Sequence, residues 1–326
     1  METSYKISIA LTTFNGSRYI IDQLSSLQTQ TRIPDEVIIC DDCSSDDTVI
    51  KVSQFILDHS LSDSWNCYRN ETNLGYVENF LNCAQKCTGD LILFCDQDDI
   101  WVQEKLETIE DVFRRHNPSA VASTYSMINS KAQKHVSLYS LYKNIPRIRK
   151  LQKVDLSTYL RLLCSSGKAL GFKRELLNEI IQKVHAYNLT YDTPIGAIAL
   201  FHDGFYILHK PIVKFRVHTS NTSAPSTKFS HRTTDVEHLI TSVQHILKMH
   251  RFVYQAYSER LSKFEKERLE KSIIMQEKNL IALQQGEIDS AFITNNLTFN
   301  PLVNKIFALV LIIYGIKKLI LNGKMI

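Results

Sequence analysis

Residues 91–101 read Leu-Ile-Leu-Phe-Cys-Asp-Gln-Asp-Asp-Ile-Trp, an apolar run that ends in a cluster of carboxylates. The short, continuous run Leu91–Cys95 is typical of a strand buried on both faces of a parallel sheet. Asp96 and Asp98 alternate, so in an extended chain they point the same way. Carboxylates crowded in this way repel each other unless a cation lies between them, and such oxygen ligands suit Mg²⁺ or Mn²⁺. The stretch therefore predicts a metal site at a strand end, with the alternative that Asp98 or Asp99 caps a helix beginning near Ile100.

Two earlier segments have the same design. Lys6–Thr12 and Glu36–Cys40 are apolar and β-branched, and each is followed by a turn and by a helical period of apolar residues. Strand, turn and helix repeated in this order predict an α/β fold with a Rossmann-like, mostly parallel sheet flanked by helices. Further strands are predicted at Ala120–Tyr125, Lys168–Phe172 and Tyr206–Val217, and further helices at Val77–Cys87, Val154–Leu163, Leu176–Val184, Ile195–Leu200 and 235–285.

Polar residues also follow the first two strands, namely Thr12, Asn15 and Asp41. Ligands of open parallel sheets bind outside the carboxyl ends of the strands, so three polar strand ends predict one shared site. An acid at the position of Asp41 also holds ribose hydroxyls in dinucleotide-binding folds. Those folds need a G-x-G-x-x-G turn after the first strand, whereas 12–17 read T-T-F-N-G-S, and the chain has no P-loop motif either.

Charge and cysteine content exclude several classes of protein. The 326 residues are 44% hydrophobic and 22% charged, with a formal net charge of +4. All of this excess lies in 301–326, which contain four lysines and no acid, so the remainder has no electrostatic reason to bind nucleic acid. The seven cysteines are scattered, and the zinc-like spacing of Cys40 and Cys43 lacks a second ligand pair. The N-terminus does not resemble a signal peptide, and we expect a reducing, cytosolic location.

The chain is expected to have three parts: a catalytic domain over 1–225, a helical extension over 226–300 and an apolar, basic tail over 301–326. The tail contains the eleven apolar residues of Ile306–Ile316, flanked by Lys305 and by the pair at 317–318. This run is too short to span a bilayer alone, but its flanking charge favours a helix lying on the cytoplasmic face of an anionic membrane. The alternative is a core helix or a dimer helix, so oligomerisation through the C-terminal helices stays open.

Four motifs in order carry a resemblance to a known family: L-T-T-F-N-G (11–16), I-I-C-D-D-C-S-S-D-D-T (38–48), N-L-G-Y (73–76) and G-D-L-I-L-F-C-D-Q-D-D-I-W (89–101). From about residue 6 to 223 the chain resembles the catalytic domain of family 2 glycosyltransferases, and D-Q-D-D-I-W resembles the bacterial rhamnosyltransferase-like branch. Cys43 stands where that family usually has glycine. The resemblance implies an A-type glycosyltransferase fold, a nucleotide-sugar donor, Mg²⁺ or Mn²⁺, and inversion of the anomeric configuration.

The resemblance also implies roles for single residues. Thr12, Phe14 and Asn15 would line the nucleotide pocket, Asp41 would meet the base, and Asp96 would contact the nucleoside or sugar of the donor. The metal would be held by Asp98 and by His218, which belongs to an R-x-H-x-x-N segment beginning at Arg216. Asp99 and Trp101 would lie on the acceptor side. Asp192 would be the catalytic base; its alternative is an N-cap of the helix at Ile195–Leu200, and His202 with Asp203 is a weaker candidate for the base.

These roles are chemically consistent with sugar transfer. Negative charge develops on the leaving diphosphate, where a cation and Arg216 would stabilise it, while a carboxylate accepts the proton of the attacking hydroxyl. We therefore expect an inverting, metal-dependent glycosyltransferase that adds a hexose or rhamnose to a lipid-linked surface polysaccharide of a bacterium, at the cytoplasmic side of the membrane. The alternative is a non-catalytic module that binds nucleotide-sugars or glycans, and a nicotinamide-dependent oxidoreductase ranks third.

Overall fold

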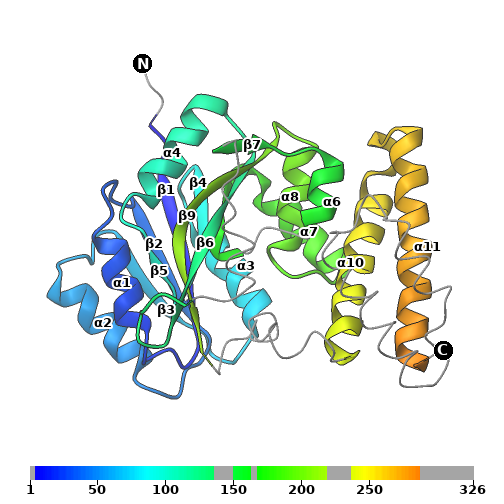
Figure 1. The fold of residues 1–326 in the computed structure, drawn as a ribbon. Coiled ribbons are helices and arrows are strands. Elements are labelled where there is room, and N and C mark those ends of the chain that lie inside the picture. Colours follow the sequence, from blue (N-terminus) through cyan, green and yellow to red (C-terminus); the bar gives the residue numbers. More distant parts are fainter. Residues whose placement is uncertain (1–3, 136–149, 163–166, 219–235, 287–326) are drawn as a thin grey trace. The chain divides into compact units, whose positions relative to one another are not determined.

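The computed structural model describes residues 4–135, 150–162, 167–218 and 236–286, and the chain divides into two compact units (Figure 1). Unit 1 comprises Met1–Val154 and Ser165–Thr219, and unit 2 comprises Asp155–Cys164 and Ser220–Ile326. Residues 155–164 thus group with the C-terminal helices, whereas the sequence-based boundary at 225 puts them in the catalytic region. The predicted tail at 301–326 lies outside the described residues.

A nine-stranded sheet forms the centre of unit 1, with the strand order β3-β2-β1-β4-β8-β6-β9-β5 and β7 paired to β9. The strands are β1 (Ile7–Thr13), β2 (Glu36–Asp41), β3 (Trp65–Arg69), β4 (Leu91–Asp96), β5 (Ile100–Trp101), β6 (Ala120–Asn129), β7 (Leu151–Lys153), β8 (Leu170–Lys173) and β9 (Phe205–Val217). The first four in this order run parallel, β8 is antiparallel to both of its neighbours, and β6 and β9 are parallel again. The predicted α/β class is confirmed, and the half of the sheet beyond β4 is mixed.

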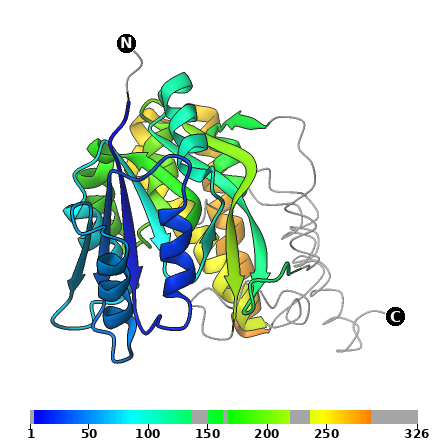
Figure 2. The same cartoon turned by 90° about the vertical axis from the view of Figure 1, so that its left-hand side faces the viewer.

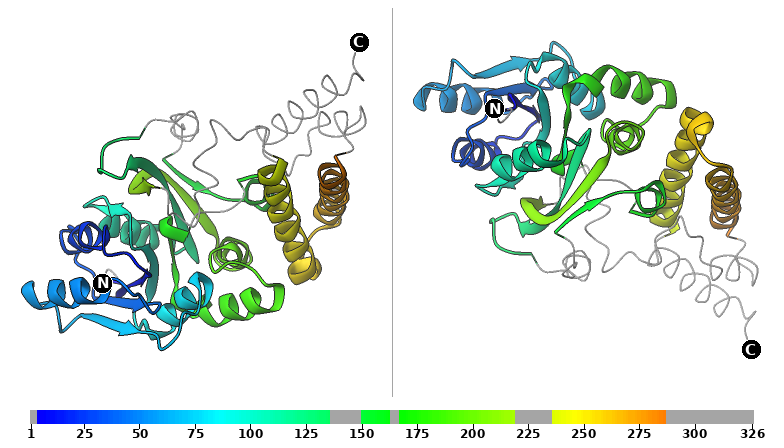
Figure 3. Two further views of the ribbon diagram at one scale, coloured as in Figure 1. Left: turned by 90° about the horizontal axis from the view of Figure 1, so that it is seen from below. Right: turned by 90° about the horizontal axis from the view of Figure 1, so that it is seen from above.

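Helices cover both faces of this sheet (Figures 2 and 3). They are α1 (Ile20–Gln28), α2 (Thr48–Asp58), α3 (Tyr76–Lys86), α4 (Lys105–His116), α7 (Leu177–Tyr187) and α8 (Thr193–Leu200), with the short 3-10 turns η1 (Gly167–Ala169) and η2 (Arg174–Leu176). Ile7, Ile9 and Leu11 of β1 belong to the same apolar core as residues of α1, α2 and α4. The rings of Phe80 on α3 and Phe94 on β4 meet edge to face on the other side. Both faces are therefore buried, which explains why the strands read as continuous apolar runs.

The order in which strands are added to the sheet reverses at β1. The strands β2 and β3 lie on one side of β1, and β4 lies on the other. Such a switch point leaves a crevice outside the carboxyl ends of the strands. Thr13 is in register with Asp41 on β2, and Thr12 is in register with Asp96 on β4. The three polar strand ends predicted to converge are therefore adjacent.

The segment after the acidic cluster differs from one sequence-based alternative. Ile100 and Trp101 form the strand β5, paired to β9, and the next helix α4 begins at Lys105 with Glu104 in the N-cap position. Asp98 and Asp99 therefore do not cap a helix, and that alternative is wrong.

Unit 2 contains α6 (Leu156–Leu162), α10 (Val236–Tyr257), the 3-10 turn η4 (Ser258–Arg260) and α11 (Lys263–Gln285). The helix α11 begins with a capping box, in which the Ser262 side chain accepts from the backbone N–H of Glu265 and the Glu265 carboxylate accepts from that of Ser262. Buried polar residues lie between α10 and α11, where the Ser272 hydroxyl is 2.9 Å from Nδ1 of His250. No helix within the described part of the chain is long and apolar enough to span a bilayer.

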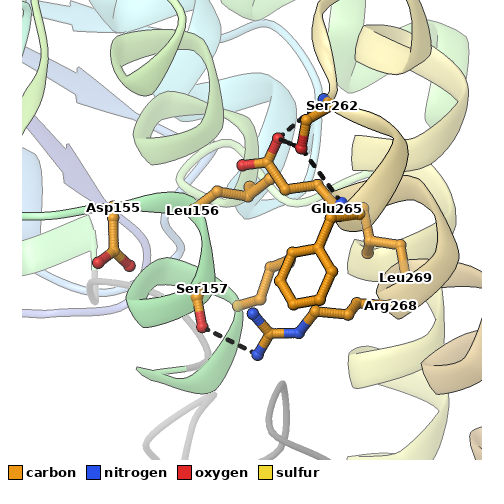
Figure 4. A pocket seen from close by; sticks show the side chains of 9 residues that line it. Asp155, Leu156, Ser157, Ser262, Glu265, Arg268 and Leu269 are labelled. Carbon is orange, nitrogen blue, oxygen red and sulfur yellow. Dashed lines mark hydrogen bonds between the residues drawn. The ribbon is translucent and has the colours of Figure 1, made fainter.

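A cavity of about 260 Å³ opens in unit 2 beside Phe264 and Arg268 of α11 (Figure 4). The guanidinium of Arg268 lies over the Phe264 ring and also donates to the Ser157 hydroxyl, 3.4 Å away. Glu265 is engaged in the capping box. The polar groups of this cavity are thus used by the helices themselves, and the chemistry predicted from the sequence lies in unit 1.

Candidate active site

The first strand end is held in place by the loops beside it. The amide of Gln97 makes two hydrogen bonds with the backbone of Phe14, accepting from its N–H at 2.9 Å and donating to its carbonyl at 3.0 Å. A Cβ at Gly16 would lie 1.9 Å from the Gln97 amide oxygen, so glycine leaves room for this contact. The Phe14 side chain stays half exposed. Gln97 was not singled out by sequence, because its partner is the backbone of a loop more than eighty residues earlier in the chain.

Asn15 and Asp41 connect the first loop to the second. Asn15 takes a left-handed φ of 46°, and its side-chain oxygen accepts from the backbone N–H of Ser45 at 2.9 Å. Asp41 is fully buried and accepts hydrogen bonds from the Thr13 hydroxyl and from both the N–H and the hydroxyl of Ser44. Both predicted donor-binding residues therefore also order the loops, and Thr12 lies nearly buried beside them.

Cys43 adopts a φ of 65°, in the left-handed region that glycine tolerates best. Glycine is the residue usual at this place in the family that the chain resembles, and the backbone conformation accounts for that preference. In the described part of the chain the cysteines are free thiols, and Cys40 is buried while Cys43 is partly exposed. The left-handed backbone of Cys43 thus shapes the loop that follows β2.

The third strand end brings Asp98 to His218. Oδ2 of Asp98 lies 2.9 Å from Nε2 of His218, and both side chains are mostly buried. The His218 ring lies against Tyr19, with the ring centroids 4.8 Å apart. These two residues are 120 positions apart in the chain, so the sequence-based metal pair is brought together by the fold. The remaining residues of the R-x-H-x-x-N segment, from 219 onward, lie outside the described residues.

Arg216 is placed differently from the prediction. Its guanidinium is 1% exposed and donates to the carbonyl of Asp98 at 2.8 Å and to the Asp22 carboxylate at 2.7 Å. It also lies over the Tyr19 ring, 4.6 Å from the centroid. A cation engaged in this way holds the loop that carries Asp98.

Asp99 and Trp101, predicted on the acceptor side, are instead buried, at 0% and 2% exposure. Asp99 accepts from the backbone N–H of Arg216 at 3.0 Å, which ties the acidic loop to the end of β9. The buried ammonium of Lys105 lies 3.2 Å from the centroid of the Trp101 ring. Burial lowers the pKa of Lys105 to about 7, against the opposing effect of Cys95, Asp99 and Asp96. Asp99, Trp101 and Lys105 are therefore buried residues that hold the acidic loop in place.

Asp192 lies at the start of α8, but its side chain does not cap that helix. Its carboxylate accepts from the N–H of Gly167 at 2.9 Å and from the Thr190 hydroxyl at 2.8 Å. The neighbouring Tyr191 is buried, and burial together with the charges of Asp96 and Asp192 raises its pKa well above the ordinary value. The Tyr191 ring packs against Phe94 of β4, with the centroids 4.9 Å apart, so Asp192 directly follows a residue in contact with the strand that leads to the acidic cluster.

The weaker candidate for the base, His202 with Asp203, makes two ion pairs with neighbouring side chains. Nε2 of His202 lies 2.9 Å from the Glu179 carboxylate, and Asp203 pairs with Lys173 at 2.7 Å. Both pairs lie on the surface. The side chains of Glu179, His202 and Asp203 are 30%, 42% and 54% exposed, and that of Lys173 is 14% exposed. They are ordinary surface ion pairs.

The chemistry of Asp98 and His218 fits a divalent cation. Carboxylate and imidazole are both ligands of Mn²⁺, and an ion of this kind usually keeps several positions for water or substrate phosphates. Among the described residues no group of three His, Cys, Asp or Glu side chains is placed to hold an ion. An ion here would therefore depend on two protein ligands and on the oxygens of a bound diphosphate.

Comparison with known proteins agrees with this arrangement. The family model "Glycosyl transferase family 2" matches residues 8–181, which is more than half of the chain. The chain is 33% identical over 129 residues to "UDP-Glc:alpha-D-GlcNAc-diphosphoundecaprenol beta-1,3-glucosyltransferase WfgD" of Escherichia coli. That match covers 39% of this chain and 49% of WfgD, so the chain spans about half the length of this relative.

Two solved structures resemble the whole chain in fold. The structure of TarS 1–349 from S. aureus in complex with UDP has a TM-score of 0.55 at 16% identity, covering 98% of this chain and 92% of that one. The mannosyltransferase PcManGT from Pyrobaculum calidifontis in complex with GDP-Man and Mn²⁺ has a TM-score of 0.51 at 15% identity, covering 97% and 88%. At such identities the likeness shows the A-type glycosyltransferase fold alone, and the matched family model decides membership. The chain belongs to glycosyl transferase family 2.

Proposed function

We propose that this chain transfers a sugar, with inversion, from a nucleoside-diphosphate sugar to a hydroxyl of a growing glycan. The observation that supports this most strongly is the contact between Asp98 and His218, whose side chains lie 2.9 Å apart. Asp192 directly follows Tyr191, whose ring packs against Phe94 of β4, the strand that leads to Asp98, with the centroids 4.9 Å apart. A metal-ligand pair and a separate carboxylate are the two groups that an inverting transfer needs.

The chain's own residues divide this work. Asp98 and His218 would hold a Mg²⁺ or Mn²⁺ ion, which would supply positive charge to the departing diphosphate. Arg216 keeps the Asp98 backbone in place through its bond to the carbonyl, and Asp99 fixes the end of β9 that carries His218. Because these contacts exist before substrate binds, the ligands need little reorganisation when the charge develops.

Asp192 is the proposed general base. Its two oxygens are oriented by Gly167 and Thr190, and one of them would take the proton from the acceptor hydroxyl as that hydroxyl attacks the anomeric carbon. Attack from the face opposite the leaving diphosphate inverts the configuration. A positioned base of this kind contributes about 10²- to 10⁴-fold to the rate.

The relatives support a choice of substrates. WfgD is named for a UDP-glucose donor and an acceptor joined to diphosphoundecaprenol, and the two structural neighbours hold UDP or GDP-Man. We propose a nucleoside-diphosphate hexose or deoxyhexose as donor and a lipid-linked glycan as acceptor. Such an acceptor requires the chain to work at the inner face of the cytoplasmic membrane, in polysaccharide assembly.

Donor consumption with and without metal tests the proposal. The chain is incubated with UDP-glucose, UDP-N-acetylglucosamine, GDP-mannose and dTDP-rhamnose, each with Mn²⁺, with Mg²⁺ or with EDTA. We expect one donor to be hydrolysed or transferred only with metal, and NMR of the first sugar product to show inversion. Binding of a donor without any turnover, to water or to an added lipid-linked acceptor, would favour the alternative of a non-catalytic binding module.

A further inference from the structure

An aromatic side chain stands half exposed next to the proposed base. Tyr76 opens α3 and is 48% exposed, and its ring meets the buried ring of Tyr191 edge to face, with the centroids 6.3 Å apart at 77°. Tyr191 directly precedes Asp192 in the chain. An exposed ring is common on protein surfaces, so the position of this one needs support from its surroundings.

That support is a rigid aromatic cluster. The Tyr191 ring stacks on Phe80 at 4.0 Å and meets Phe94 edge to face at 4.9 Å, and Phe80 and Phe94 are themselves in contact at 5.2 Å. Phe80, Phe94 and Tyr191 are buried. Tyr76 is therefore the outer member of a four-ring cluster whose other three members are fixed in the core.

The backbone before Tyr76 is also fixed. Gly75 has a φ of 81°, which favours glycine, and its N–H donates to the Asp42 carboxylate at 2.9 Å. The N–H of Leu74 donates to the same carboxylate at 2.8 Å. Asp42 follows directly after β2, so the residue that begins α3 is anchored to the strand ends that form the site. A ring held on two sides loses little conformational entropy when a ligand packs against it.

The ring contact places Tyr76 beside the residue that precedes the proposed base. Its ring meets that of Tyr191, which Asp192 directly follows in the chain. Burial and the Asp192 carboxylate also raise the pKa of Tyr76 above its ordinary value. The substrate that must reach Asp192 is the acceptor.

We infer that Tyr76 forms the aromatic wall of the acceptor subsite and packs against the C–H face of the acceptor sugar whose hydroxyl Asp192 deprotonates. The ring would offer a flat apolar surface and a polar hydroxyl at its edge, which suits a pyranose with an apolar face and polar rim. Leu74, two residues before Tyr76, is also half exposed. This inference rests on the proposed function.

The test compares Tyr76→Ala, Tyr76→Leu and Tyr76→Phe with wild type. The probe acceptor is N-acetylglucosamine diphosphate carrying a short alkyl chain, and the donor is whichever nucleotide sugar the metal-dependent assay selects. Tyr76→Ala and Tyr76→Leu should raise the acceptor KM about 10-fold or more, as expected when a substrate loses an apolar contact. Tyr76→Phe keeps the ring and should stay close to wild type, and the donor Kd should be unchanged in all three.

The matched control is Tyr68→Ala, because Tyr68 is exposed to a similar degree (43%) and its ring lies against Lys86 at the far end of α3. Thermal unfolding and donor binding show whether each variant is folded. Wild-type acceptor KM in folded Tyr76→Leu, or a loss of donor binding in place of acceptor binding, would overturn the inference while leaving the proposed function standing. A wild-type chain that binds donor but never turns it over would overturn the proposed function, and with it the inference.

Discussion

At the residue scale, the contact between Asp98 and His218 joins two distant parts of the chain. Their side chains lie 2.9 Å apart although 120 positions separate them, and the acidic loop is held at two further points by Arg216. The loop is therefore positioned by groups other than Asp98 itself. Removing the Asp98 carboxylate should consequently affect chemistry more than folding.

We expect Asp98→Ala to abolish metal-dependent transfer and to leave the metal-free chain folded, because Arg216 holds the loop through the Asp98 carbonyl and the Asp99 carboxylate. Activity and urea unfolding are measured in parallel. Asp203→Ala is the control, because it removes a carboxylate from a surface pair with Lys173 and should leave activity intact. Full activity of Asp98→Ala with an identified donor would refute the metal assignment.

Asp192→Asn should lower kcat by about 10²- to 10⁴-fold and leave donor Kd nearly unchanged, because a general base does not contact the nucleotide. Asparagine keeps one oxygen that can accept from Gly167, and its amide can donate to the Thr190 hydroxyl, so the local structure should survive. Kinetics at saturating donor and a separate donor titration give the two values. An equal collapse of donor binding would make Asp192 a structural residue.

The sequence predicted the polar strand ends well and their individual roles less well. Asp41, Asp96 and Asp98 follow apolar runs, and the ends of adjacent parallel strands must meet. The surroundings of Asp99 and Trp101 come from β9, more than one hundred residues further along the chain, and those of Arg216 come from Asp22 and Asp98, equally far back. A carboxylate reads the same in sequence whether it faces a ligand or a distant backbone N–H, and a guanidinium reads the same whether it faces a ligand or a distant carbonyl.

The α10–α11 hairpin has a buried titratable group at the element scale. His250 is fully buried beside Ser272, and burial lowers its pKa from 6.5 to about 4. The folded state therefore resists protonation, while the unfolded state takes up a proton below about pH 6.5. Stability of unit 2 should fall as the pH falls from 6.5 to 4, by about 3 kcal/mol in total.

Urea unfolding between pH 7.5 and 4.5, followed by circular dichroism, measures this dependence. In His250→Gln the fall over this range should be much smaller, because glutamine does not titrate. His202→Gln, which changes an exposed histidine of unit 1, should keep the wild-type profile. An unchanged slope in His250→Gln would assign the acid sensitivity to other groups.

Three strands, β3, β5 and β7, were not predicted from the sequence, and the reason is physical. Of the five residues in β3, only Trp65 is buried, because this strand lies at the edge of the sheet. The two residues of β5 and the three of β7 are strands only because β9 pairs with them. Such elements depend on tertiary contacts and leave little periodicity in the sequence, whereas β1, β2 and β4 are buried throughout most of their length and were predicted within one residue.

The tail at 301–326 concerns the molecule as a whole, and it lies outside the described residues. We expect deletion of this tail to leave a chain that still binds donor but no longer sediments with anionic liposomes, since its lysines and apolar run suit an anionic surface. Liposome sedimentation at low and high salt, with neutral liposomes as control, measures this. Unchanged liposome binding, or unfolding after the deletion, would favour a core or dimer helix instead.

The contact between Asp98 and His218 also sets an order of events while the chain is being made. A ribosome adds Asp98 to the nascent chain 120 residues before it adds His218, and Arg216, which braces the same loop, comes just as late. Closing so long a loop is entropically costly and belongs to the last stages of assembly. The nucleotide-side loops of the first 101 residues therefore exist as sequence well before the metal pair is complete. On the proposed metal assignment, a partly synthesised chain would lack the means to activate a donor until His218 has been added.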